Sequence, residues 1–298
     1  MKKQYARKHI VFMKSMVWAG TIGATLALLL RVVLMPTLRD SDTGRFDTSW
    51  VVVAFMVLMV ALLALPAVKL SMTPPAVVGR GAIPLSLASM GAGVALLLPS
   101  LWDAWNWLAT GEQPAPYIDI NNIMGSITLL GTLLFGIIGG VSLIRLGLQI
   151  SSEGSARRGM ASWEALAPVL WMWFRLARYE MSYASAVGLS EIFYDFMLFI
   201  FSLLFLFRFA RFIAGVGTPT MGGLLFFSTT TAIFSLSGPL TRLCMYLLGD
   251  SEAYHASQLA GWPDLGIGVL ALTFAYTLVN SARSQSSSVS ASDADSQQ

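Results

Sequence analysis

The chain has 298 residues, of which 55% are hydrophobic and only 12% charged, and its mean hydropathy is +0.67. A soluble domain carries roughly a quarter charged residues, so this composition excludes a water-exposed globular protein. The net charge of +3 is unevenly spread, because five lysines and arginines lie within the first fourteen residues. This basic segment directly precedes an apolar run, which is typical of a cytoplasmic membrane anchor and not of a nucleic-acid-binding segment.

Apolar runs of about 20 residues, the length that crosses a bilayer, recur along the chain. We expect transmembrane helices over 15–35, 49–68, 82–101, 122–146, 192–207, 221–247 and 265–279. In the fourth run, Gly136 and Gly140 are four residues apart, a spacing that suits close helix packing. The predicted organisation is a basic cytoplasmic N-terminus (1–14), a transmembrane helical domain (15–280) and a disordered Ser-rich tail (281–298).

One further segment, 163–183, decides the number of crossings. Its apolar core is short and is followed at once by Arg175 and Arg178. If the segment spans, eight helices place both termini in the cytoplasm; if it lies in the interface, seven helices place the C-terminus outside. Both arrangements assign equal numbers of lysines and arginines to the cytoplasm, but Arg208 and Arg211 directly follow the most apolar run and favour eight. We therefore predict an all-α polytopic bundle of eight spans, with seven plus an interfacial helix as the alternative.

The residues needed for familiar catalytic and metal sites are scarce. The chain has two histidines and a single cysteine, Cys244, so an H-E-x-x-H zinc site and an intrachain disulfide are excluded. No phosphate-binding G-x-x-x-x-G-K-[ST] loop and no G-x-S-x-G nucleophile elbow occurs. We predict no catalytic, metal or cofactor-binding residues, and we do not expect an enzyme.

Four charged residues at membrane depth form the main candidate site, because ionisable groups are costly there. Arg175 and Arg178 are three residues apart and Glu191 and Asp195 four apart, so each pair lies on one helix face. In an antiparallel hairpin that turns within 182–188, the register predicts the pairs Arg175–Asp195 and Arg178–Glu191. Two interpretations stay open: an ion-pair clamp that fixes the hairpin, which we favour, and a substrate or proton site.

The run 221–247 is rich in serine and threonine and contains Gly238 followed by Pro239. Proline removes a backbone donor and clashes with the preceding turn, while glycine adds freedom. We therefore expect a helix break near 235–239. Transporters use such interruptions to present backbone groups to a ligand, whereas the interpretation we favour is a kinked packing helix.

The stretch 171–211 carries a set of aromatic and charged residues that resembles uncharacterised multi-pass membrane proteins of anaerobic Gram-positive bacteria. The residues that carry this resemblance are Trp171-Met-Trp-Phe-Arg175, Tyr179, Tyr183, Leu189-Ser-Glu191, Phe193, Asp195, Phe205 and Arg211. The resemblance implies a bacterial cytoplasmic-membrane location and no particular activity.

These observations predict a multi-pass integral protein of the cytoplasmic (plasma) membrane with a cytoplasmic N-terminus. We expect a non-enzymatic scaffold or regulator whose partners are the lipid bilayer and another membrane protein, with no nucleic acid and no cofactor. The alternative is a small-solute transporter or channel that uses the charged hairpin and the broken helix.

Overall fold

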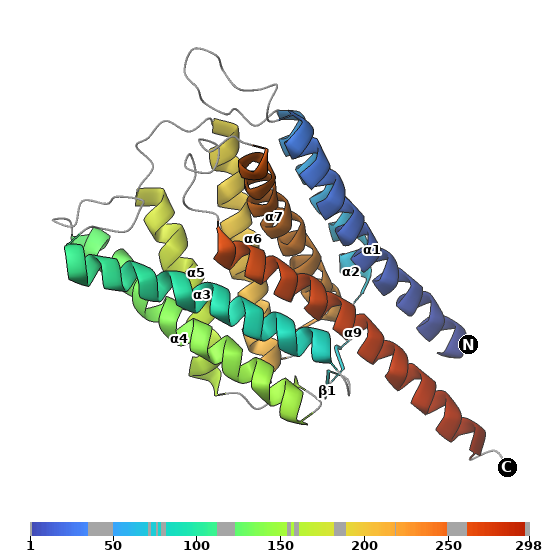
Figure 1. Cartoon of the computed structure of the whole chain (residues 1–298). Helices are drawn as coiled ribbons and strands as arrows, with labels where there is room; N and C mark the ends of the chain where they lie inside the picture. Colours follow the sequence, from blue (N-terminus) through green and yellow to red (C-terminus); the bar gives the residue numbers. More distant parts are fainter. Residues whose placement is uncertain are drawn as a thin grey trace.

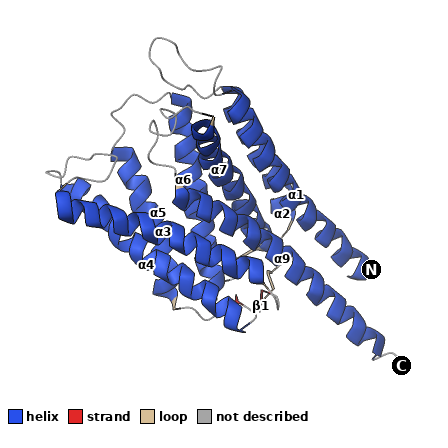
Figure 2. Cartoon of the chain, viewed as in Figure 1, coloured by secondary structure: helices blue, strands red, loops and turns tan. Residues whose placement is uncertain are grey.

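The computed structural model describes residues 2–34, 50–70, 73–75, 77–78, 82–111, 123–153, 156–157, 161–181, 189–217, 219–248 and 261–295. Apart from two short strands, the elements in these ranges are helices (Figure 2). The helices are α1 (Lys2–Leu34), α2 (Trp50–Lys69), α3 (Ile83–Thr110), α4 (Ile123–Glu153), α5 (Ser162–Met181), α6 (Leu189–Ile213), α7 (Met221–Leu247) and α9 (Trp262–Asp295). The strands β1 (Val77–Val78) and β2 (Ala156–Arg157) pair antiparallel.

Seven of the described helices, all except α5, are long and apolar enough to cross a membrane. Their outer surfaces carry large apolar side chains that a soluble protein would bury, such as Trp18 (66% exposed) and Leu65 (66% exposed). The predicted all-α polytopic membrane bundle is confirmed. It includes α5 as an eighth helix, which packs between α4 and α6.

The path of α5 follows from the loops that meet at one end of the bundle. Strand pairing joins the α2–α3 connection to the α4–α5 connection, and the N–H of Gly222, at the start of α7, donates to the carbonyl of Leu70, just after α2. The ends of α2, α4 and α6 therefore lie together, so α5 leads away from this end and α6 returns to it. The first turn of α1 and the last turn of α9 lie at the same end of the molecule (Figure 1). The described chain therefore contains eight helices, of which seven are long and apolar enough to cross a membrane.

Glycines allow α3 and α4 to pack at close range. A Cβ on Gly93 would stand 2.6 Å from the carbonyl oxygen of Gly140, and one on Gly140 would stand 2.8 Å from that of Gly93. Because backbone cannot move aside as a flexible side chain can, both positions exclude larger residues. Gly136 likewise lies against Ser100 and Trp171, which confirms close packing at the predicted glycine pair.

Helix α7 is the most deeply buried of the candidate spans and contacts α1, α2, α6 and α9. It begins at Thr220, whose hydroxyl accepts from the N–H of Gly223. The predicted break at Gly238 and Pro239 is wrong, because the helix continues through both to Leu247. Gly238 instead provides room for a neighbouring ring: a Cβ there would lie 3.0 Å from Cε1 of Tyr194.

Several helices are longer than the sequence predicted. Helix α3 continues past residue 101 to Thr110 and ends on Gly111, whose φ of 72° is readily adopted by glycine. At the two ends of the chain, α1 includes most of the basic segment, and α9 extends to Asp295, into the tail that was expected to be disordered.

Candidate functional site

Buried charges gather at the end of the bundle opposite the ends of α1 and α9 that carry the chain termini. They come from α1, α5, α6, α7 and α9, and each is at most 8% exposed. An ionised side chain is costly at membrane depth unless it is paired, so the partners of these residues determine what the cluster does. Its members are Arg31, Arg175, Arg178, Asp195, Arg242 and Asp264.

Arg175 forms a two-bond pair with Asp264 at the first turn of α9. Its Nη1 and Nη2 donate to Oδ1 and Oδ2 at 2.6 and 2.7 Å, and the side chains are 9% and 0% exposed. The guanidinium also lies 4.8 Å from the ring centre of Phe199, and the N–H of Gly261 donates to Asp264 Oδ2 at 3.0 Å. The predicted pair Arg175–Asp195 is therefore wrong: Arg175 ties α5 to α9, not to α6.

Asp195 instead binds α7. Arg242 Nη2 donates to the two carboxylate oxygens of Asp195 at 3.1 and 3.4 Å. Beside this pair, the Arg31 guanidinium from α1 stacks 3.8 Å from the ring centre of Tyr194. The hydroxyl of Tyr194 donates to the carbonyl oxygen of Phe234 at 2.5 Å. Residues of α1, α6 and α7 are thus joined in one buried polar group.

The second predicted pair, Arg178–Glu191, lies outside the described residues, because the side chain of Glu191 is not described. Arg178 is 5% exposed and lies close enough to Asp103 of α3 for the two charges to interact. Asp103 interacts in the same way with Arg175. The described carboxylates whose charges act on Arg175 and Arg178 thus lie on α3 and α9, two helices that the hairpin prediction did not involve.

Sequence reasoning did not single out Asp264 and Arg242. Asp264 follows Trp262 and Pro263 at the edge of the last apolar run, and Arg242 lies three residues after Pro239. The available signal was the arginine itself, because a charge inside an apolar run needs a partner from another helix.

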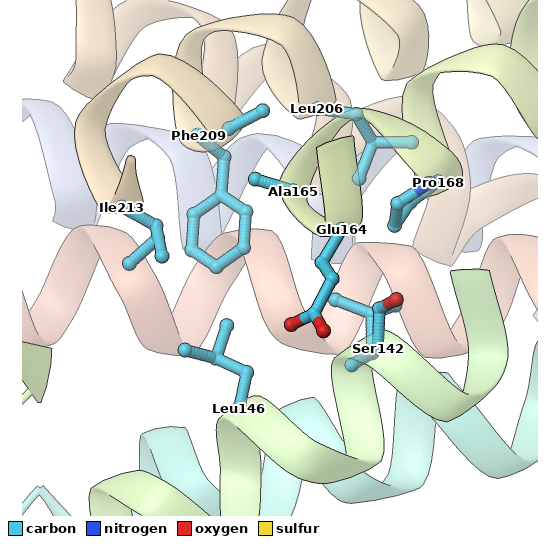
Figure 3. Close-up of a pocket in the computed structure, with 10 residues that line it drawn as sticks. Ser142, Leu146, Glu164, Ala165, Pro168, Leu206, Phe209 and Ile213 are labelled. Carbon is cyan, nitrogen blue, oxygen red and sulfur yellow. The ribbon is translucent and has the colours of Figure 1, made fainter. Parts of the chain in front are cut away.

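At the opposite end of the bundle, Glu164 borders a small pocket between α4, α5 and α6 (Figure 3). Its carboxylate extends toward Ser142 and Leu146 of α4, and its Oε1 accepts from Nη1 of Arg145 at 2.6 Å. The cavity volume is about 10 Å³, the room of one water molecule. With apolar residues such as Phe209 around it, this pocket cannot hold a solute.

Three pockets in the described part of the chain are lined almost wholly by apolar side chains, and none of the three includes a member of the charged cluster. No group of three histidines, cysteines or carboxylates forms a metal site among the described residues. In chemical terms, the described cluster joins helices through buried arginine–carboxylate bonds.

No protein-family model, curated protein or solved structure matches this chain.

Proposed function

We propose that this protein is a non-enzymatic scaffold of the bacterial cytoplasmic membrane that holds a partner membrane protein against its flank. The observation that carries the proposal is the contrast between paired charges inside the bundle and an open groove on its side. Arg175–Asp264 and Arg242–Asp195 are buried ion pairs between helices, whereas a lateral groove opens between α3 and α9.

The groove is built from small residues. Its volume is about 500 Å³, and a Cβ added at Gly91 would meet nothing within 4 Å. Leu87 stands on the rim, 60% exposed. In a membrane, small residues let a second helix approach closely and gain van der Waals contact, so the occupant we propose is a transmembrane helix of the partner. The small residues that line it are Ala88, Gly91, Ala92, Ala95 and Gly266.

The basic N-terminal segment supports a cytoplasmic location for the end of the bundle that carries both termini, because positively charged segments are retained on that side. The α2–α3 and α4–α5 connections lie at the same end. Lys69 ends α2, and the connections contain Arg80, Arg157 and Arg158. The buried cluster then faces the outer leaflet.

The transporter alternative loses its main support in α7. Its premise was an interrupted helix at Gly238 and Pro239, and α7 is continuous there. The charges that would have bound a substrate are engaged across helices, with Asp264 fully buried against Arg175. Chains of paired charges also occur in proton relays, so measured transport would restore this alternative.

Site-directed cross-linking in native membranes tests the scaffold. In a Cys244→Ala background, Leu87→Cys on the groove rim is labelled with benzophenone maleimide, whose benzophenone inserts into C–H bonds of a neighbouring chain when it is irradiated. We expect one discrete adduct with a different membrane protein, identified by mass spectrometry. The matched control is Leu62→Cys, which is 52% exposed on α2 and away from the groove; it should give no such adduct.

A second variant makes the test specific for the groove. A Cβ at Gly91 meets nothing within 4 Å, so we expect Gly91→Trp to place its indole in the groove and abolish the Leu87→Cys adduct while the purified protein keeps its melting temperature. The proposal is overturned if Leu87→Cys gives no adduct, if Leu62→Cys gives the same one, or if the adduct survives Gly91→Trp. An adduct with a second copy of this chain would also overturn the proposal, because the groove would then be an interface for self-association and not for a different protein.

A further inference from the structure

A second, narrower crevice opens on another flank, between α2 and α6, with α7 as its floor. Its volume is about 100 Å³, smaller than the ~150 Å³ apolar cavity that takes up a benzene molecule. Val57 on its lip is 54% exposed, so the crevice is reached from the lipid side. Its walls and floor include Val53, Val57, Val60, Met197, Phe201 and Phe234.

The α6 wall of this crevice leads to an arginine. Arg208 follows Phe201 by seven residues and Met197 by eleven, and both spacings return to the same face of a helix with 3.6 residues per turn. The guanidinium of Arg208 lies 5.6 Å from the ring centre of Phe227 on α7. A Cβ on Gly223 would stand 3.5 Å from its Nη1, so the head group rests against the first turn of α7.

The charge of Arg208 is not matched by the described protein. Within the described part of the chain, no carboxylate lies within salt-bridge distance of Arg208, which is half-buried. Arg145, Arg175 and Arg242 each have such a carboxylate. A half-buried guanidinium between apolar walls attracts an anion with paired oxygens, and a phosphate group suits its planar fork.

The distances fit one lipid molecule. At about 1.5 Å per residue, Phe201 and Met197 lie roughly 10 and 16 Å along α6 from Arg208. One leaflet contributes about 15 Å of hydrocarbon. A lipid whose phosphate meets Arg208 therefore has the end of an acyl chain at the level of the crevice, whose volume suits a short hydrocarbon segment.

We propose that α2, α6 and α7 form a binding site for one anionic phospholipid, with its phosphate on Arg208 and an acyl-chain end in the crevice. The lipid comes from the leaflet at the end of the bundle that carries the chain termini, where α6 ends. This site is separate from the scaffold groove between α3 and α9, so either proposal can fail without the other.

Native mass spectrometry of the full-length protein in detergent tests the site. Dioleoyl phosphatidylglycerol, dioleoyl phosphatidylcholine and inorganic phosphate are titrated in parallel. We expect one phosphatidylglycerol to bind several times more tightly than phosphatidylcholine, and phosphate alone to show no binding. Arg208→Gln should weaken phosphatidylglycerol binding roughly tenfold, because a charge-assisted contact is lost, and Arg208→Lys should recover part of it.

Arg211→Gln is the matched control. Arg211 lies one turn further along α6, also without a carboxylate partner in the described chain, and its guanidinium folds toward Phe207 and Gly217. It should change binding less than twofold. Val57→Trp fills the crevice and should weaken phosphatidylglycerol binding while leaving the melting temperature of the lipid-free protein unchanged.

Each contrary result overturns the site. Equal losses for Arg208→Gln and Arg211→Gln would indicate unspecific attraction to a basic surface. Unchanged binding in Val57→Trp would remove the crevice from the site, and binding of phosphate alone would make it a site for free anions. Equal affinity for the two lipids would show that the site does not select an anionic lipid, which contradicts the proposal.

Discussion

Replacing Asp264 by asparagine tests whether the buried charges hold the helices together. The substitution preserves the shape of the side chain and leaves an oxygen to accept from the N–H of Gly261. It removes the negative charge that faces Arg175 at 2.6 and 2.7 Å. Arg175 then stays in a seam where its side chain is 9% exposed, without the carboxylate that balanced it.

The expected loss of stability is large because neither partner is reached by water. Breaking a buried ion pair by removing one partner costs about 3–5 kcal/mol. A second change, Arg175→Met, removes the stranded charge and should recover about 1–3 kcal/mol. Arg145→Gln is the matched comparison: its contact with Glu164 is also 2.6 Å long, but the Arg145 side chain is 64% exposed. Such an exposed pair contributes about 0–1 kcal/mol.

The free energy of unfolding is measured for five proteins, namely the wild type, Asp264→Asn, Arg175→Met, the double variant and Arg145→Gln, by circular dichroism in mixed micelles with a rising fraction of denaturing detergent. We expect Asp264→Asn to be far less stable than Arg145→Gln, and the double variant to be more stable than Asp264→Asn alone. The reasoning is refuted if Asp264→Asn costs no more than Arg145→Gln. It is also refuted if the loss in the free energy of unfolding of the double variant equals the sum of the losses of Asp264→Asn and Arg175→Met.

Three further outcomes follow from the packing. Asp195→Asn should destabilise the fold by about 3–5 kcal/mol, and adding Arg242→Met should restore part of it in the same unfolding assay; a purely additive double variant would argue against the pair. Gly140→Val should cost more than the ~1–3 kcal/mol of ordinary overpacking, because its Cβ meets the backbone of Gly93. Gly91→Val should leave the melting temperature unchanged, since its Cβ meets nothing, and a marked loss would show that the groove is closed.

The helices were predictable because membrane crossing imposes a length and a composition that single segments display. The run 221–247 coincides with α7, and the spacing of Gly136 and Gly140 correctly indicated close packing. Extensions such as 102–110 of α3 were missed because the apolar run ends at residue 101, where Trp102 and Trp105 follow; tryptophans are typical of the membrane interface, and a helix can continue through it. The apolar pattern shows which residues lie in lipid, but it does not show where the backbone hydrogen bonds of the helix end.

The partners of the charges were not predictable from local register. Arg175 lies 89 residues from Asp264, and Asp195 lies 47 from Arg242, so both pairs depend on how non-neighbouring helices dock. Hairpin register only relates adjacent helices and therefore assigned Arg175 to Asp195. Pro239 misled in a similar way, because surrounding helices stabilise a proline-containing helix in a membrane, and here Tyr194 packs directly on Gly238.

The topology proposed for this protein depends on α5 crossing the membrane, because this crossing places the buried charges at one end and both termini at the other. Cysteine labelling measures it directly. In a Cys244→Ala background, single cysteines at Lys3, Thr110 and Ser287 are exposed to an impermeant maleimide in sealed vesicles of known orientation. The account predicts that Lys3→Cys and Ser287→Cys react from the same side and Thr110→Cys from the opposite side. If Ser287→Cys instead reacts from the side of Thr110→Cys, α5 does not cross and the account is contradicted.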